Sequence, residues 1–170
     1  MAQLKFYKIN QQATLPEYAT EQSACFDICF WKDPSSPFNF MLYSKHNAKI
    51  YREFAAGGKI LITPNERALV PTGLIADIPK GYSLRMHTRS GLALKSGIVL
   101  ANQEAVIDSD YVEPLMILLR NVSKRNIAFS EGDRICQGEL VKTVPVTIKE
   151  TTKKPEQKTS RVGGMGSTGV

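Results

Sequence analysis

Short apolar runs, each bounded by Pro, Gly, Asn or Asp, recur along most of the 170-residue chain. The runs are rich in β-branched and aromatic residues, which favour strands, and the residues between them favour turns. They cover residues 4–9, 25–30, 66–79, 81–88, 97–107, 113–123, 126–130 and 134–148. Segment 90–97, SGLALKSG, is a candidate for a short helix, but no long apolar period of 3.6 residues occurs. The pattern predicts an all-β fold: a sandwich, barrel or jelly roll.

Two segments interrupt this pattern. Residues 31–58 are rich in aromatic and basic residues and look like an insertion, either a surface loop or an extra hairpin. From residue 149 onward almost no large apolar side chains occur, so this part cannot bury a core of its own. We therefore expect one β domain over residues 1–148, carrying the insertion, and a flexible C-terminal arm over 149–170.

Composition and charge agree with one globular domain but do not select a function. The hydrophobic fraction is 42%, and 22 Lys and Arg against 16 Asp and Glu give a net charge of +6. This charge suits a polyanionic substrate, a nucleic-acid surface or simply solubility. Cys25, Cys29 and Cys136 lack zinc-site spacing and are predicted to be reduced, as in an intracellular protein. We find no signal peptide or membrane span, so we expect a cytoplasmic protein without a membrane partner.

Three segments have residues suited to phosphate binding: TRSGLA at 88–93, GDRICQ at 132–137 and RVGGMGSTG at 161–169. Glycines let backbone N–H groups approach phosphate oxygens, hydroxyls donate hydrogen bonds, and arginine binds oxyanions through a planar fork. Taken singly, each has an ordinary interpretation: a loop, a β-turn with a surface ion pair, or a flexible linker. The last segment is not a Walker loop, since no Lys-Ser/Thr follows its glycines.

A fourth segment, NQEAVIDSDY at 102–111, lies between apolar strands and is expected to form a hairpin. Asp108 directly follows an apolar pair, where a carboxylate can orient and deprotonate a water molecule. Tyr111 offers a flat apolar face to a sugar ring. The alternative is an Asx-type turn in which Asp108 and Asp110 merely bind backbone groups.

The order of these blocks is more specific than any one of them. ACFDI at 24–28, RSGLA at 89–93, VIDSDY at 106–111, GDRICQ at 132–137 and GGMGSTG at 163–169 together resemble the five motifs of the trimeric dUTPase family. The resemblance covers the chain apart from 31–58. It implies a jelly-roll-like β-barrel that forms a homotrimer and hydrolyses dUTP to dUMP and pyrophosphate, which keeps uracil out of DNA and supplies dUMP for dTMP synthesis. Some phage and viral relatives carry insertions, which is consistent with a viral origin.

The resemblance also implies roles for individual residues. Asp108 activates the water that attacks the α-phosphorus, and Mg²⁺ lies across the phosphates with Asp27 contacting it through water. Residues of one subunit that hold uracil and deoxyribose are Asn102, Val106, Ile107, Tyr111 and Met116. A neighbouring subunit holds the phosphates with Arg89, Ser90, Gly91 and Gln137. The arm of a third subunit closes over the site with Arg161, Met165, Gly166, Ser167 and Thr168.

This chain departs from the family pattern at several positions. Cys25 and Ala105 stand where the family usually has Gly, Pro114 removes a backbone donor after the tyrosine, and Met165 replaces a Phe. The residues assigned to the chemistry are present, so we expect activity with altered substrate affinity.

Three other functions agree with parts of the sequence. A dCTP deaminase resembles the same fold but usually has Asp-Pro-Gly-Phe where this chain has DSDY at 108–111. A regulatory protein would use the insertion to bind a protein or nucleic acid, through Trp31, Tyr43, Lys45, Lys49, Tyr51 and Arg52. A basic nucleic-acid-binding barrel rests only on net charge and scattered aromatics.

Overall fold

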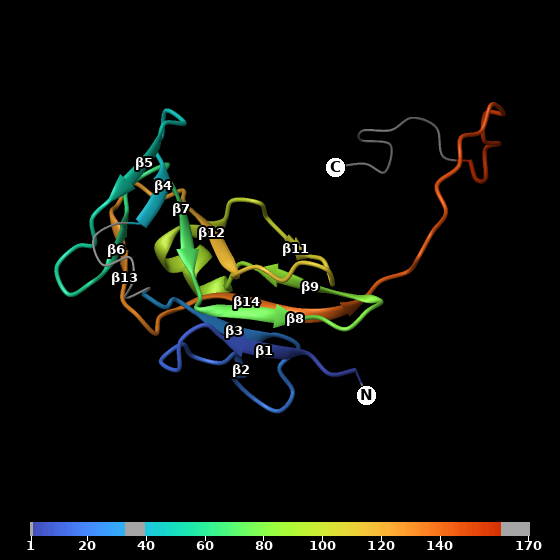
Figure 1. Cartoon of the computed structure of the whole chain (residues 1–170). Coiled ribbons are helices and arrows are strands. Elements are labelled where there is room, and N and C mark those ends of the chain that lie inside the picture. Colours follow the sequence, from blue (N-terminus) through green and yellow to red (C-terminus); the bar gives the residue numbers. More distant parts are fainter. Residues whose placement is uncertain (1, 33–39, 161–170) are drawn as a thin grey trace.

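Two five-stranded antiparallel sheets make up most of the barrel (Figure 1). The computed structural model describes residues 2–32 and 40–160. In chain order the strands are β1 (Lys5–Lys8), β2 (Glu17–Tyr18), β3 (Phe26–Cys29), β4 (Phe40–Tyr43), β5 (Lys49–Arg52), β6 (Ile60–Ile62), β7 (Arg67–Pro71), β8 (Leu74–Asp77), β9 (Tyr82–His87), β10 (Ile98–Leu100), β11 (Ala105–Ile107), β12 (Met116–Asn121), β13 (Ile127–Phe129) and β14 (Arg134–Lys142). The larger sheets have the orders β10-β12-β7-β4-β5 and β11-β9-β14-β3-β2, and β1-β8 and β13-β6 form two small sheets.

The two large sheets share one core. Alternate residues of each strand point inward, so the buried cluster draws Ile28, Leu84 and Met86 from one sheet and Leu42 and Leu119 from the other. These side chains are almost fully buried, and burying one such side chain stabilises the fold by about 1.5–3 kcal/mol. The predicted all-β fold is therefore confirmed.

The apolar runs predicted most strands correctly, although two runs each contain two strands. Run 97–107 becomes β10 and β11. Run 66–79 becomes β7 and β8, separated by a turn at Gly73, whose φ is 70°. A Cβ there would lie 2.7 Å from Ala13 Cβ and from Trp31 Cδ2, so glycine is required. Segment 90–97 contains a short helix, η1 (Leu92–Ser96), which ends at Gly97 with φ 64°. Among the described residues, no helix is long and apolar enough to cross a membrane.

The segment interpreted as an insertion is partly core. Strands β4 and β5 form a hairpin, as one of the two interpretations predicted, but β4 also pairs with β7 through Leu42–Ala68 and Tyr43–Arg67. Phe40 and Leu42 are consequently buried in the main core. The interpretation as a surface loop is therefore wrong, because every second residue of β4 faces apolar side chains.

Trp31 is also buried, with only 5% of its surface exposed, and its backbone N–H donates to Pro71 O at 3.0 Å. Its assignment to a partner-binding surface is therefore wrong. Arg52 forms a buried ion pair with Glu66, so it is not free to bind a partner either. Tyr43, Lys45, Lys49 and Tyr51 remain at the surface or partly exposed.

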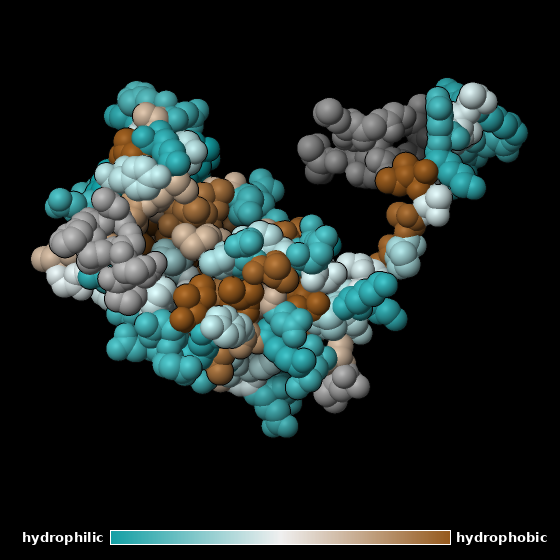
Figure 2. Space-filling view, in the orientation of Figure 1, coloured by the Kyte–Doolittle hydropathy of each residue, from teal (hydrophilic) through white to brown (hydrophobic). Residues whose placement is uncertain are grey.

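The last strand is shorter than predicted. It ends at Lys142, and the last backbone hydrogen bond to the barrel runs from Thr143 N to Gly81 O at 2.8 Å. The described part of the arm then leads away from the barrel (Figure 1). Val144, Val146 and Ile148 alternate along it and are 80%, 77% and 93% exposed, which appears as brown residues along the arm in Figure 2. Pro145 lacks a backbone donor, and no strand within residues 2–32 and 40–160 pairs with the segment.

Candidate active site

Asp27, Gln137 and His87 are brought into one row by strand pairing. Gln137 on β14 lies opposite Asp27 on β3 and opposite His87 on β9. Residues directly opposite each other in antiparallel strands point to the same face. Two residues predicted from motifs far apart in the sequence, Asp27 and Gln137, therefore lie on one polar face of the β11-β9-β14-β3-β2 sheet.

Two arginines bind the carboxylate of Asp27. Arg89 Nε donates to Asp27 Oδ1 at 2.7 Å, and Arg134 donates to Oδ2 at 3.0 Å. Arg89 also donates to the backbone carbonyl oxygen of Arg134 at 3.2 Å, which holds the Arg89 side chain against the start of β14. Asp27 is only 15% exposed whereas Arg134 is 54% exposed. Two guanidinium groups on one carboxylate leave a net positive charge at the surface, which suits an oxyanion such as a phosphate.

Arg134 belongs to the predicted phosphate segment GDRICQ but is not among the site residues predicted from the sequence. Arg134 and Asp27 are 107 residues apart in the sequence, and the pair follows only from the pairing of β14 with β3. The available signal was the Gly-Asp-Arg turn, where Gly132 has φ 84°.

Ser90 and Gly91 follow Arg89 directly and open the turn that leads into η1. Ala93 N donates to Arg89 O at 3.0 Å, and both Ser90 and Gly91 are exposed. Just before them, Thr88 Oγ1 accepts a hydrogen bond from Leu100 N at 2.8 Å. This bond links the predicted phosphate loop to the end of β10, where the predicted substrate loop begins.

The predicted substrate loop differs from a simple hairpin. Strands β10 and β12 pair with each other, and the connection between them crosses to the other sheet, where β11 pairs with β9. Val106 lies opposite Arg85 and is exposed, whereas Ile107 lies opposite Leu84 and is half-buried. Asn102 lies in the exposed turn between β10 and β11.

Asp108 lies immediately after β11. Its side chain is exposed, and among the described residues it has no hydrogen-bond or ion-pair partner. Its carbonyl oxygen accepts from Tyr111 N at 3.1 Å, which closes a turn, and Tyr111 OH donates to Pro114 O at 3.2 Å. The Asx-type alternative is therefore not what the structure shows for Asp108, because its carboxylate is left free.

Charged side chains that were not predicted hold β11 to its neighbours. Arg85 donates to Glu104 at 2.6 Å, and His87 lies between Glu139, at 3.0 Å, and Glu104, at 3.9 Å. The two histidine pairs are ionic only when the imidazole is protonated. This chain of contacts connects β14, β9 and the segment before β11, close to Asp108.

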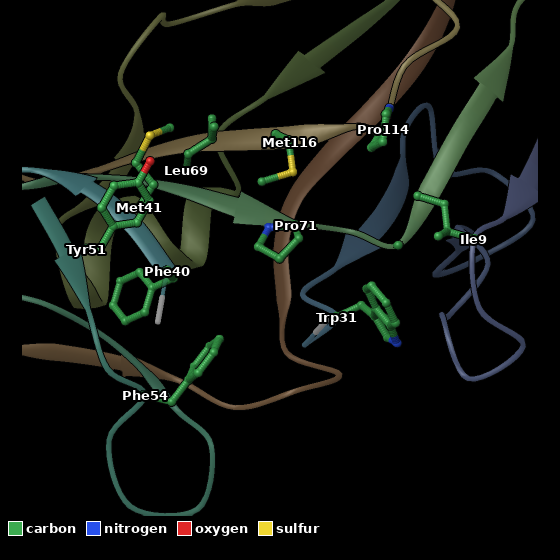
Figure 3. A pocket seen from close by; sticks show the side chains of 11 residues that line it. Ile9, Trp31, Phe40, Met41, Tyr51, Phe54, Leu69, Pro71, Pro114 and Met116 are labelled. Atoms are coloured by element: carbon green, nitrogen blue, oxygen red, sulfur yellow. The ribbon is translucent and has the colours of Figure 1, made fainter. Parts of the chain in front are cut away.

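Met116 is set apart from this polar face. It begins β12 in the other large sheet and lines an apolar groove of about 480 Å³ (Figure 3). Other lining residues include Trp31, Met41, Tyr51, Leu69 and Pro114. Within the described residues, no hydrogen bond or ion pair joins Asp108, Tyr111 or Met116 to Arg89 or Gln137. Arg161, Met165, Gly166, Ser167 and Thr168 lie outside the described residues.

The cysteine thiols are not suited to act as nucleophiles, although Cys29 lines a hollow beside Asp27 and Arg134. Burial raises the pKa of the Cys136 thiol above its ordinary value, and the nearby charge of Asp27 raises it further. Burial also raises the pKa of Cys25 and Cys29. Because the thiolate is the nucleophilic form, these residues are poor nucleophiles.

Comparison with known proteins identifies the family. The dUTPase family model matches residues 54–169, which begin just after the β4–β5 hairpin. The chain belongs to the dUTPase family. The deoxyuridine 5'-triphosphate nucleotidohydrolase of Hydrogenobaculum is 31% identical over 163 residues, covering 96% of this chain and 95% of that protein. The Brucella melitensis protein of the same name is 42% identical over 113 residues, covering 66% of this chain and 71% of its own length. As a dUTPase, the chain is a dUTP diphosphatase.

Solved structures show the same fold. A G164S mutant of the dUTPase of Staphylococcus bacteriophage 80alpha, with dUpNHpp, has a TM-score of 0.75 at 20% identity, covering 100% of both chains. The dUTPase of Streptococcus mutans has a TM-score of 0.65 at 22% identity, covering 84% of this chain and 98% of that one. The predicted resemblance to dUTPases is therefore confirmed.

Proposed function

We propose that this dUTPase hydrolyses dUTP by a direct attack of water on the α-phosphorus, with Asp108 as the general base. The exposed, unpaired carboxylate of Asp108 at the end of β11 is the observation that carries the proposal. A carboxylate with free lone pairs can accept a proton from a water molecule and orient it for attack. The products are dUMP and pyrophosphate, and removal of dUTP keeps uracil out of DNA while supplying dUMP for dTMP synthesis.

The Arg89–Asp27–Arg134 cluster binds the phosphate chain in this proposal. The exposed guanidinium of Arg134 offers N–H donors to the phosphates. Ser90 and Gly91 add a hydroxyl and a backbone N–H at the turn after Arg89. Gln137 lies in the same row as Asp27 and contributes an amide. Donors fixed before the substrate arrives need little reorganisation as charge develops on the phosphates.

The loop after β10 binds the nucleoside. Backbone groups at Val106 and Ile107, with the side chain of Asn102, read the edge of uracil. Tyr111 packs on deoxyribose, held by its hydrogen bond to Pro114 O, and leaves no room for a 2′-hydroxyl. Met116 lines the base pocket from the other sheet.

Mg²⁺ fits this site as an ion that arrives with the substrate. Both oxygens of Asp27 already accept from guanidinium groups, and within the described residues no three His, Cys, Asp or Glu side chains are grouped to hold a metal. Asp27 therefore suits contact through water, because each carboxylate oxygen keeps a further lone pair. The bound ion would neutralise phosphate charge and hold the phosphate chain in a reactive geometry.

We further propose that the site is completed by three copies of the chain. Val144, Val146 and Ile148 alternate along the arm and are exposed, with none of the residues that the structure describes covering them, which supports packing on another copy. The arm residues Arg161, Met165, Gly166, Ser167 and Thr168 would then close over a neighbour's site and exclude water.

Two experiments test this mechanism. Hydrolysis in ¹⁸O-water should place the label in dUMP, and label found only in pyrophosphate would rule out attack at the α-phosphorus. For the shared site, the two inactive variants Asp108→Asn and Arg89→Gln are unfolded, mixed and refolded together. Activity should return in the mixture because some sites combine an intact Asp108 with an intact Arg89 from another copy. A mixture that stays inactive, while refolded wild type is active, would show that each chain builds its own site.

A further inference from the structure

The β10-β12-β7-β4-β5 sheet has a second face, turned away from the core, of which the proposed reaction uses only Met116, at the start of β12. Strand register places Tyr43 opposite Lys49 and Arg67, and Arg67 opposite Arg120. Residues opposite each other share a face, so these four side chains form one row across four strands. We call Lys49, Tyr43, Arg67 and Arg120 the basic row.

Two arginines of the basic row have no carboxylate partner. Arg67 binds Asn47 Oδ1, and Arg120 has no hydrogen bond or ion pair in the described part of the chain. The arginines that do pair with carboxylates on this barrel are Arg52, Arg85, Arg89 and Arg134. Like charges placed directly opposite across two strands are unfavourable. An adjacent, unneutralised arginine pair is therefore suited to bind an anion.

A polar hollow surrounds this pair. It has a volume of about 480 Å³ and is lined by Ser44, Lys45, His46, Asn47, Asn65, Arg67 and Arg120. No acidic residue occurs among the lining residues, and residues 40–52 of the hairpin contain none either. The hairpin tip, at the upper left of Figure 1, is correspondingly hydrophilic in Figure 2. The hairpin thus adds Lys45 and Lys49 to a site already positive from β7 and β12.

Aromatic rings lie directly beside these cations. The guanidinium of Arg67 is 5.4 Å from the centre of the Tyr43 ring, and Lys49 Nζ is 5.4 Å from that of Tyr51. Tyr51 is 63% exposed. One row further along the strands, Tyr51 pairs with Met41, and both line the apolar groove seen in Figure 3. Rows two residues apart are about 7 Å from each other, so cationic and flat apolar surfaces alternate over a short distance.

We propose that this face binds single-stranded nucleic acid. The phosphates lie against Arg67, Arg120 and the lysines of the hairpin, and bases stack on Tyr51 and the adjacent apolar groove. A positive groove beside exposed aromatic rings is the arrangement by which proteins bind single strands without reading their sequence. A free phosphate would need only the cations, and a duplex would keep its bases stacked internally, so neither would use Tyr51.

The test is fluorescence anisotropy of a labelled oligothymidylate, about 15 nucleotides long to span one such site. The full chain is used with EDTA, between about 50 and 200 mM salt, where phosphate contacts dominate the salt dependence. We expect binding that weakens with salt. Arg67→Gln with Arg120→Gln should lower the salt slope by about 1.4, since each phosphate contact on a single strand contributes about 0.7. Tyr51→Ser should weaken binding at least about fivefold through lost stacking.

The matched control is Lys80→Gln with Lys124→Gln, which removes the same charge from exposed positions outside this face. It should bind the oligonucleotide nearly as wild type. Should the double arginine variant fail to fold, Lys45→Gln with Lys49→Gln on the hairpin replaces it. The arginine and lysine variants should keep dUTP hydrolysis, because none of these residues belongs to the proposed active site; Tyr51→Ser is judged by oligonucleotide binding alone, since Tyr51 lines the same groove as Met116.

Four results would overturn the proposal. The first is that wild type does not bind the oligonucleotide at low salt, and the second is that the control variant loses as much affinity as the arginine variant. The third is that Tyr51→Ser binds as tightly as wild type while tripolyphosphate competes as well as unlabelled oligonucleotide. The fourth is a sedimentation coefficient that falls in the arginine variant, which would make this face a contact between copies of the chain.

Discussion

The buried ion pair between Arg52 and Glu66 should contribute to the free energy of unfolding, because it joins the β4–β5 hairpin to the rest of the barrel. Glu66 is 6% exposed and accepts from Arg52 at 2.7 and 2.6 Å and from Thr63 N at 2.7 Å. Arg52 also donates to Leu61 O at 3.0 Å. The pair thus connects β5 to the turn before β7 and to β6. Glu66→Gln keeps the shape and one acceptor for Thr63 but leaves the arginine charge without its partner.

Removing one member of a buried pair costs about 3–5 kcal/mol, because an uncompensated charge remains. Arg52 is 27% exposed, so we expect Glu66→Gln to lose about 3 kcal/mol, at the lower end of that range. For a protein of this size, this corresponds to a melting temperature lower by about 6–12 °C. Urea unfolding at one fixed protein concentration measures the free energy directly, since assembly would make stability concentration-dependent.

The double variant Arg52→Met/Glu66→Gln separates the pair from its surroundings. Losing both charges should cost less than the sum of the two single changes, with a coupling of at least about 2 kcal/mol. Glu104→Gln is the control, since Glu104 pairs with Arg85 at 2.6 Å but is 46% exposed, and it should change stability by less than about 1 kcal/mol. If Glu66→Gln were no more destabilising than Glu104→Gln, the hairpin would not depend on this pair and the reasoning would be refuted.

Three further outcomes follow from burial, backbone geometry and charge. The Cys136 thiol should react with a thiol reagent only on unfolding, because the residue is buried and burial raises its pKa. Cys25 is partly exposed and should react in the native protein. Reaction of Cys136 in the native protein before Cys25 would contradict this. Gly97→Ala should lose about 1–2 kcal/mol in thermal unfolding, since φ is 64° and a Cβ would lie 2.8 Å from Ser123 Cβ, whereas Gly81→Ala, in open space at φ 85°, should lose only the backbone part. Burial would raise the pKa of Glu66, but the hydrogen bonds from Arg52 and Thr63 hold this pKa below its ordinary value of 4.5. The stabilisation from the ionised carboxylate is therefore present above pH 4.5 and is lost as the pH falls through the lower pKa of the folded state. The free energy of unfolding in urea should accordingly fall less steeply with decreasing pH in Glu66→Gln than in wild type, and parallel curves for the two proteins would refute this.

Local patterns predicted the elements well because the signals for strands and turns are local. Run 134–148 predicts the position of β14 but not its end, since whether residues 143–148 form a strand depends on a pairing partner that the described part of the chain does not supply. Segment 90–97 is a helix candidate in the sequence, and η1 lies within it, between Gly91 and Gly97.

Pairing between strands that lie far apart in the sequence could not be predicted from local patterns. Nothing near Trp31 or Phe40 in the sequence shows that β4 pairs with β7, and without this pairing the hairpin looks like a surface insertion. The same limit applies to the site: Asp27 and Gln137 were predicted from motifs, but Arg134 was not included because its partner lies 107 residues away. Contacts between copies of the chain, which the proposed site requires, leave no local pattern except the exposed apolar side chains of the arm.

The most direct test of the central claim is pyrophosphate release from dUTP with Mg²⁺, measured beside dCTP, dTTP and UTP. Wild type should release pyrophosphate from dUTP alone. Asp108→Asn should abolish release, whereas Asp110→Asn, the same change two residues further along the loop, should retain most of it. Removing a general base typically costs about 10²–10⁴-fold in rate. Equal rates for Asp108→Asn and wild type would contradict the assignment of the base, and no release from dUTP by folded wild-type protein would contradict the reaction itself.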